Sequence, residues 1–324
     1  MNHSVLSFYR FVEVPDVEAL QAAIREACVR HDARGRIYVA AEGVNATICV
    51  PCDQHDALVV ALNALDALRD VHIKVETVDR QVFEKLRVRL RPHLVNMGEA
   101  THLDPHESGG QRLSPEQWRE WLASDRDYLL LDVRNDYEGL IGRFRGAVVP
   151  PYATFAEFPQ WARELGEGEA RKPVLMYCTG GIRCEKFSGL LMQHGFDEVY
   201  QLDGGILHYV ERCGGEHFEG ECFVFDDRVS IDVGGAPDTR ARCAHCGEPT
   251  PRYRNCANVD CHKLFLCCDA CALEHRGVCQ AACLEAPRLR PVAGEHLRRP
   301  WRGVGTELGG AGVRFRAVRG AVTP

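Results

Sequence analysis

The sequence predicts a multidomain α/β protein, built from an α+β domain, an α/β domain with a central parallel sheet and a small cysteine-rich metal-binding module. The chain has 324 residues, which is long for one domain. Between residues 112 and 217, apolar strand patterns alternate with helical patterns, as in a parallel sheet covered by helices. Nine of the sixteen cysteines lie between residues 243 and 283. That density predicts metal ligation in a reducing compartment.

The first domain is predicted to span residues 1–97. Hydrophobic periodicity gives a strand, a helix, two strands, a helix and a strand, at residues 5–12, 17–31, 37–41, 46–50, 55–68 and 72–78. This βαββαβ order is typical of a ferredoxin-like, or acylphosphatase-like, sandwich. Between the two middle strands, Glu42-Gly-Val-Asn45 predicts a hairpin turn.

A linker at residues 98–111, rich in glycine, histidine and charge, is predicted to lead into the α/β domain at 112–217. Ser114-Pro-Glu-Gln117 has the composition of a capped helix start. Strands are predicted at 128–132, 173–177 and 198–202, and further helices at 157–165, 186–194 and 205–213. Asp132 and Cys178 follow the apolar runs of two strands. In such sheets, ligands bind outside the carboxyl ends of the strands.

The segment from Cys178 to Arg183 predicts a reactive-cysteine site. Backbone N–H groups of the loop can converge on the Cys178 sulfur, and the start of the next helix adds its positive dipole end. Both effects favour a thiolate, which is the nucleophilic form of cysteine. Two glycines allow backbone angles that other residues rarely adopt. The predicted active-site loop consists of Thr179, Gly180, Gly181, Ile182 and Arg183.

Several neighbours are predicted to support this loop. We expect Asp132 and Arg134 to hold it through ion pairs and hydrogen bonds. Cys184 could pack in the core or could resolve an oxidised Cys178. Glu185 and Lys186 are predicted to lie on a solvated helix face, with Lys186 and Arg183 as alternative phosphate contacts.

The cysteine-rich module is predicted at residues 218–284. Its intervening segments are short and polar, so a metal would substitute for a hydrophobic core. Paired cysteines at close spacing suit tetrahedral zinc, and iron–sulfur ligation is the alternative. Eight ligands would hold two ions: Cys243, Cys246, Cys256, Cys261, Cys268, Cys271, Cys279 and Cys283.

A net charge of −7 excludes a generally basic, nucleic-acid-coating surface, so an RNA partner would need a local patch. Arg87, Arg89 and Arg91 alternate along a predicted strand, which places them on one face. They would suit an RNA backbone or form an ordinary solvated face. Residues 285–324 carry eight arginines and no lysine and predict a flexible basic tail, either without function or RNA-binding.

The N-terminal residues lack the layout of a signal peptide, and no apolar run approaches the ~20 residues that span a bilayer. The sequence therefore predicts a cytoplasmic protein without a membrane partner.

Three motifs in order resemble a rhodanese domain: Asp132-Val-Arg134 with its following acids, the Cys178-to-Arg183 loop, and Leu202-Asp-Gly-Gly205. In rhodaneses the loop cysteine carries persulfide sulfur, and Cys178 is the matching residue. The related dual-specificity phosphatases have a loop one residue longer. Gly142-Arg-Phe-Arg145 and Tyr209 depart from the usual rhodanese pattern.

The whole layout over about residues 1–283 is similar to the oxygen-dependent tRNA uridine hydroxylases. The resemblance rests on Ala41-Glu-Gly-Val-Asn45, Leu86-Arg-Val-Arg-Leu-Arg91, Asn135-Asp-Tyr-Glu138 and the Cys178 loop. It implies hydroxylation of the wobble uridine of tRNA to 5-hydroxyuridine, with dioxygen as the co-substrate.

The chemistry of the residues leaves alternatives open. C5 hydroxylation by dioxygen ordinarily requires a redox partner, and the sequence has no flavin or nucleotide fingerprint. Cys178 could add to C6 of uracil or carry an oxidised sulfur, and a reductant or sulfur donor would be a further partner. A sulfurtransferase moving persulfide sulfur to a thiol or RNA is the alternative activity, and an RNA-binding adaptor is the non-enzymatic one.

Overall fold

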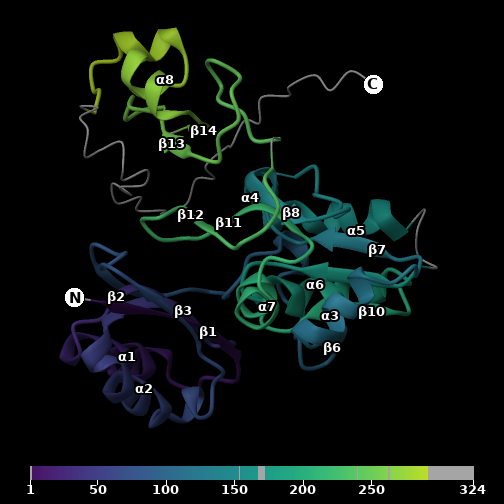
Figure 1. The fold of residues 1–324 in the computed structure, drawn as a ribbon. Helices are drawn as coiled ribbons and strands as arrows, with labels where there is room; N and C mark the ends of the chain where they lie inside the picture. Colours follow the sequence, from purple (N-terminus) through teal and green to yellow (C-terminus); the bar gives the residue numbers. More distant parts are fainter. Residues whose placement is uncertain (1, 153, 167–171, 239, 262, 291–324) are drawn as a thin grey trace.

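The computed structural model describes residues 2–152, 154–166, 172–238, 240–261 and 263–290. Figure 1 shows three parts: the N-terminal domain, an α/β domain beside it, and a cysteine-rich segment that lies above both. The predicted fold class is confirmed. No helix in these ranges is long and apolar enough to cross a bilayer. The predicted basic tail beyond residue 290 lies outside the described residues.

The N-terminal domain has the predicted ferredoxin-like order of elements. They are β1 (His3–Phe11), α1 (Val17–Arg30), β2 (Arg34–Ala40), β3 (Gly43–Pro51), α2 (His55–Asn63), β4 (Lys74–Val78) and β5 (Leu86–Leu90). The sheet order is β4-β1-β3-β2-β5; only β5 pairs parallel, with β2. Strand β5 carries Arg87 and Arg89 of the predicted arginine stripe, and Arg91 directly follows its last residue.

The two faces of this sheet differ in chemistry. Leu6 and Phe8 of β1 pack against α1 and α2, whereas the alternate residues Ser7 and Tyr9 line a cavity on the opposite face. The helix-free face is therefore available to meet the second domain.

Gly43, at the start of β3, lies very close to β1. Its φ is +137°, and a β-carbon there would lie 2.0 Å from the Arg10 carbonyl oxygen, so this position requires glycine.

The α/β domain contains a parallel sheet with the order β6-β10-β9-β7. Successive side chains of β9 point to opposite faces of this sheet. Val174 and Met176 pack with α5 and α6, whereas Leu175 and Tyr177 pack with α3 and α7. A capping box at Ser114 starts α3, as predicted. The elements are β6 (Gln111–Leu113), α3 (Pro115–Leu122), β7 (Leu129–Asp132), α4 (Asp136–Ile141), α5 (Phe158–Gly166), β9 (Val174–Tyr177), α6 (Ile182–Gln193), β10 (Val199–Leu202) and α7 (Gly205–Cys213).

A small antiparallel sheet extends the α/β domain toward the cysteine-rich segment. Strand β8 (Gly142–Phe144) pairs with β11 (Phe218–Phe223), which pairs with β12 (Ser230–Asp232). The cysteine-rich segment contains β13 (Tyr253–Asn255), β14 (Leu264–Leu266) and α8 (Asp269–Glu274). Short 3-10 helices lie at Cys52–Gln54, Asp66–Leu68, Gly98–Ala100, Phe155–Glu157 and Ala281–Glu285.

The segment predicted as a linker is packed between domains. Thr101 is buried, and its carbonyl accepts a hydrogen bond of 2.6 Å from Lys186 of α6. His106 Nε2 lies 3.0 Å from the Phe11 carbonyl oxygen at the end of β1. These contacts fix the N-terminal sheet over the start of α6.

Candidate active site and metal sites

Cys178 lies at the carboxyl end of β9, in the loop that leads into α6. The Gly181 N–H donates to its sulfur at 3.1 Å, and the Arg183 N–H also hydrogen-bonds it. Gly181 has a φ of +103°, and a β-carbon there would lie 2.8 Å from the Tyr9 hydroxyl. Glycine is required at this position because the amide turns inward and a tyrosine of the other domain approaches the loop closely.

These groups favour the ionised form of Cys178. Burial alone would raise the pKa of this thiol, but hydrogen bonding from Cys184, the Arg183 charge and the loop amides lower the pKa to about 5. At neutral pH the sulfur is therefore a thiolate. Burial raises the pKa of the Cys184 thiol well above its usual value, and the Cys178 charge raises it further. Cys184 thus keeps its proton.

Arg183 is held in place by Glu138 of α4. Its two terminal nitrogens donate to the two carboxylate oxygens at 2.6 and 2.8 Å. Burial would raise the Glu138 pKa, but Arg183 lowers it below its usual value. Thr179 Oγ1 lies 3.4 Å from the same carboxylate. Sequence reasoning assigned no role to Glu138, although it closes the motif that begins at Asn135.

Asp132 and Arg134 form a fully buried pair beneath the loop. The Arg134 Nε and Nη2 atoms donate to Asp132 at 2.8 and 2.6 Å. The Tyr177 hydroxyl donates to the same carboxylate at 2.9 Å. Tyr177 precedes Cys178 in the chain, so the pair anchors the strand end that carries the reactive sulfur.

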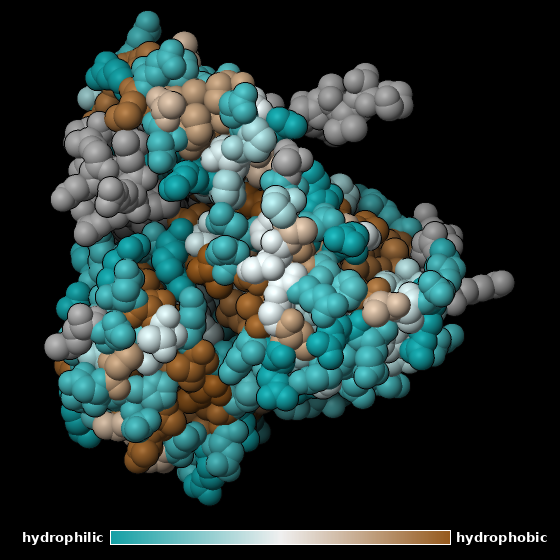
Figure 2. All heavy atoms as spheres, viewed as in Figure 1, coloured by the Kyte–Doolittle hydropathy of each residue, from teal (hydrophilic) through white to brown (hydrophobic). Residues whose placement is uncertain are grey.

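Cys178 opens into a cavity of about 460 Å³, which we call the thiolate pocket. One wall is the reactive loop, and the other is the helix-free face of the N-terminal sheet, including Arg36, Tyr38 and Asn45. Figure 2 shows hydrophobic residues in the hollow where the N-terminal domain meets the rest of the molecule. The volume lies within the range of about 300–1,000 Å³ that is usual for small-molecule sites.

Lys74 of β4 also lines the thiolate pocket, and sequence reasoning missed it. Its side chain is buried, and its Nζ donates to the Gly180 carbonyl at 2.8 Å. Burial lowers the Lys74 pKa, and the Cys178 thiolate partly offsets this effect. Lys74 comes from a different domain, and an isolated lysine in a short strand gives no signal in the sequence.

Glu185 and Lys186 are buried, so the prediction of a solvated helix face was wrong for both. Glu185 accepts a hydrogen bond of 2.7 Å from the Tyr9 hydroxyl. Lys186 donates to Glu42 at 2.7 Å and to the Thr101 carbonyl at 2.6 Å. The N-terminal domain covers this turn of α6. Lys186 therefore joins the two domains and presents no exposed ammonium to a phosphate.

The three arginines of the predicted stripe lie beside the thiolate pocket. Arg87 and Arg89 of β5 are partly exposed and pair in register with Arg36 and Tyr38 of β2. The Arg91 guanidinium lies 5.1 Å from the centre of the Tyr38 ring. The stripe therefore continues the basic and aromatic face that walls the pocket.

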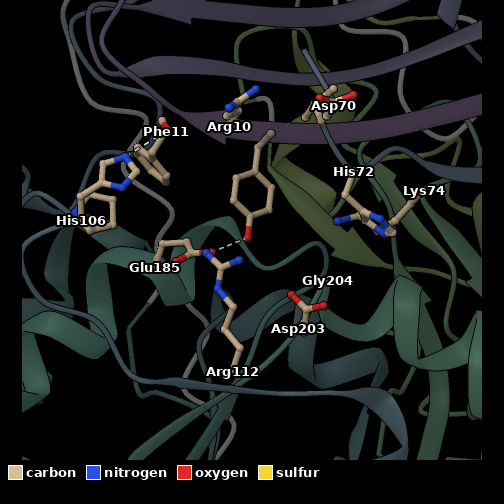
Figure 3. A pocket seen from close by; sticks show the side chains of 13 residues that line it. Arg10, Phe11, Asp70, His72, Lys74, His106, Arg112, Glu185, Asp203 and Gly204 are labelled. Atoms are coloured by element: carbon tan, nitrogen blue, oxygen red, sulfur yellow. Dashed lines mark hydrogen bonds and ion pairs between the residues drawn. The ribbon is translucent and has the colours of Figure 1, made fainter. Parts of the chain in front are cut away.

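A second cavity, of about 430 Å³, lies on the other side of Tyr9 and Lys74. In Figure 3 the side chains of Arg10, His72 and Lys74 face those of Arg112, Glu185 and Asp203 from the α/β domain. Cys178 does not line this cavity.

The eight predicted metal ligands fall into two sets of four. Within each set all four sulfurs lie within 4.8 Å of one another. The sets interleave along the chain, because the first pair of each set is completed by a later pair. They are Cys243, Cys246, Cys268 and Cys271, and then Cys256, Cys261, Cys279 and Cys283. Each set could hold a metal ion.

The distances between the sulfurs indicate which kind of metal centre each set of four cysteines could hold. Cys246 and Cys268 sulfurs are 3.8 Å apart, and Cys261 and Cys279 sulfurs are 3.7 Å apart. Four thiolates about 2.3 Å from one tetrahedral zinc ion lie about 3.8 Å from one another. An iron–sulfur cluster places several metal atoms between its thiolates and needs wider separations. The donor sets fit single tetrahedral ions.

Three family models match successive parts of the chain. Residues 3–94 match the UPF0176 acylphosphatase like domain, residues 114–212 the Rhodanese-like domain, and residues 219–284 the Rhodanase C-terminal model.

Full-length relatives match as well. A tRNA uridine(34) hydroxylase of Protochlamydia amoebophila is 38% identical over 301 residues, covering 92% of this chain and 93% of that protein. The proteins of the same name from Chlamydia trachomatis serovar D and Chlamydia felis are each 37% identical over 93% of this chain, and the matches cover 92% and 93% of those proteins. With this identity along almost its whole length, the chain belongs to the tRNA uridine(34) hydroxylase family.

Proposed function

We propose that this chain hydroxylates C5 of the wobble uridine of tRNA in the cytoplasm, with dioxygen as the co-substrate. One observation carries the proposal: the Cys178 thiolate opens into a nucleoside-sized cavity whose opposite wall is basic and aromatic. The names of the relatives supply the substrate and the reaction.

The cavity suits an unpaired RNA base. Proteins bind single-stranded RNA by stacking splayed bases on aromatic rings and by contacting phosphates with arginine. Tyr38 supplies a ring in the cavity wall, and Arg89 and Arg91 continue from it along the adjoining strand. A wobble base is already unpaired, so moving it into a pocket costs less than extracting a base from a duplex.

The thiolate provides a route to C5 chemistry. Attack of Cys178 sulfur on C6 of uracil forms a C–S bond and moves the C5–C6 electron pair toward C5 and the C4 oxygen. C5 then becomes nucleophilic enough to react with dioxygen. The Lys74 ammonium on the cavity wall would stabilise the negative charge that develops on the ring.

We assign zinc to the two cysteine sets, with a structural role. Zinc would supply the cross-links that the short segments between residues 243 and 283 need in order to fold. All four ligands of each set come from the protein, so each zinc site would be closed to substrate.

A sulfurtransferase remains the second candidate because the amides that stabilise the thiolate would equally stabilise a persulfide anion on Cys178. The two activities differ in what purified protein carries. A sulfurtransferase would show a stable additional sulfur on Cys178 by intact-protein mass spectrometry, and a hydroxylase would not.

The test is nucleoside mass spectrometry of tRNA from cells that lack the gene and are complemented with wild type or Cys178→Ser. We expect 5-hydroxyuridine and its derivatives to return with wild type and not with Cys178→Ser. Cys213→Ser, which removes a half-buried thiol on α7, is the matched control and should behave as wild type. Unchanged modification in every strain would refute the proposal.

A further inference from the structure

The proposed hydroxylation requires two electrons that the uridine does not provide. Dioxygen accepts four electrons on full reduction, and conversion of a C–H bond into C–OH supplies only two. Flavins, haem or redox metals commonly supply the remainder. The sequence carries no nucleotide-binding fingerprint, and the two cysteine sets fit closed single-ion sites.

We propose that Cys178 and Cys184 supply the missing two electrons by forming a disulfide within the active-site loop at each turnover. The inference rests on the proposed hydroxylase function. It gives Cys184 a chemical role and adds to the site a reductant-binding step, in which a small or protein dithiol restores the pair.

The geometry places the two sulfurs together. Cys178 ends β9, and Cys184 lies in the first turn of α6, where its N–H bonds to the Gly181 carbonyl at 3.1 Å. Both side chains are fully buried in one cluster, and Cys184 is among the groups that lower the pKa of the Cys178 thiol. Gly181 contacts both residues, because its N–H donates to the Cys178 sulfur at 3.1 Å and its carbonyl accepts the hydrogen bond from the Cys184 N–H.

Cys178 and Cys184 differ in ionisation and in position, as a nucleophile and the thiol that later reacts with it should. Cys178 is ionised and lines the cavity, so it can attack a substrate atom. Cys184 stays protonated and lies behind Cys178, out of contact with the cavity. This arrangement suits a sequence of two steps. Cys178, which faces the cavity, would become a sulfenic acid, and the Cys184 thiol would then react with it to form a disulfide.

The step balances in atoms and electrons. Cys178 adds to C6, the C5 electron pair bonds to dioxygen, and a proton completes a C5 hydroperoxide. Loss of the C5 proton expels Cys178 as thiolate. That thiolate then attacks the terminal oxygen; the O–O bond breaks, and 5-hydroxyuridine and a Cys178 sulfenic acid form. The Cys184 thiol displaces the hydroxyl as water, forming the disulfide. In total, uridine, dioxygen and two thiols give 5-hydroxyuridine, water and one disulfide.

The experiment is a single-turnover reaction of the reduced, metal-replete full-length chain with tRNA and dioxygen, with no reductant present. We expect one 5-hydroxyuridine per chain and, in the same samples, loss of the Cys178 and Cys184 thiols as a disulfide found by peptide mass spectrometry. Adding a dithiol should restore the pair and permit further turnovers.

Cys184→Ser separates the chemical role from a packing role. This variant should still form one product per chain but leave Cys178 as a sulfenic acid that dimedone traps, with no disulfide. Cys222→Ser is the control, because Cys222 is equally buried and its thiol bonds to the Phe223 carbonyl and not to the Cys178 sulfur. It should give the wild-type disulfide.

The outcomes distinguish the two proposals. Product from wild type with Cys178 and Cys184 both still free thiols would overturn the inference, and so would product that requires an added electron donor for the first turnover. Failure of wild type to form product with any dithiol would instead overturn the hydroxylase function itself.

Discussion

Lys74 of the N-terminal domain donates a hydrogen bond of 2.8 Å to the Gly180 carbonyl of the reactive loop. Arg183 and Lys186 have carboxylate partners in Glu138 and Glu42. Lys74, in contrast, has no carboxylate within ion-pair distance in the described part of the chain. A buried ammonium without a carboxylate is costly. Among the charges that stabilise it, the Cys178 thiolate has the largest effect and raises the Lys74 pKa against the effect of burial.

The first prediction is that Lys74→Met weakens ionisation of Cys178. Methionine fills a similar volume without charge, and removal of a nearby cation should raise the thiol pKa by about one unit. The measurement is the pH dependence of iodoacetamide alkylation at Cys178. Lys85→Met, at an exposed lysine of the same domain, is the control and should leave the profile unchanged. An unchanged profile for Lys74→Met would show that the ammonium does not act on the thiolate.

The second prediction concerns stability against pH. The pKa of Cys178 is lowered from 9.0 to about 5 in the folded chain. The ionised sulfur therefore contributes its full stabilisation above pH 9 and progressively less as the pH falls toward 5, below which the contribution is absent. Between pH 8 and pH 6, the free energy of unfolding of wild type relative to Cys178→Ser should fall by about 3 kcal/mol. Urea unfolding at the two pH values measures this, and a pH-independent difference would contradict the lowered pKa.

The sequence predicts those parts of the site that are local in the chain. The reactive loop follows from an apolar run, a cysteine, two glycines and an arginine within eleven residues. The two metal sets follow from cysteine spacing, although spacing alone does not determine that the sets interleave.

Contacts between domains could not be predicted in this way. Glu185 and Lys186 have the composition of a solvated helix, and only the packing of Tyr9 and Glu42 against them explains their burial. Lys74 lies more than a hundred residues before the loop that it contacts. Such pairings depend on how two independently patterned domains meet, which no local periodicity encodes.

The third prediction is that Glu138→Gln destabilises the fold. The change leaves the buried Arg183 charge without its counter-charge, which typically costs about 3–5 kcal/mol. Chemical denaturation of the full-length chain measures the loss. Glu26→Gln breaks the exposed pair with Arg30 on α1 and should change stability by no more than about 1 kcal/mol. Equal effects of the two substitutions would mean that the Arg183–Glu138 pair contributes no more than a surface ion pair.

The fourth prediction uses two adjacent cysteines as a matched pair. Cys268 belongs to the first metal set, whereas Cys267 belongs to neither. We expect elemental analysis to find two zinc ions in wild type and in Cys267→Ser, and one in Cys268→Ser. Both residues lie at the end of β14, so a general disturbance of this segment would affect the two variants alike. Equal zinc loss in both would contradict the assignment of ligands.

The fifth prediction tests the basic face beside the thiolate pocket. Arg91 stacks on Tyr38 next to the cavity, whereas Arg30 lies on α1, on the helix-covered side of the same sheet. If the anticodon loop lies along β2 and β5, Arg91→Gln should weaken tRNA binding and reduce the slope of log affinity against log salt by about one. Arg30→Gln removes the same charge and should leave affinity and slope unchanged. Filter binding of tRNA over a salt series measures both quantities. An equal loss in the two variants would indicate attraction by overall charge, because only a contact at a defined site distinguishes two arginines on opposite faces of one sheet.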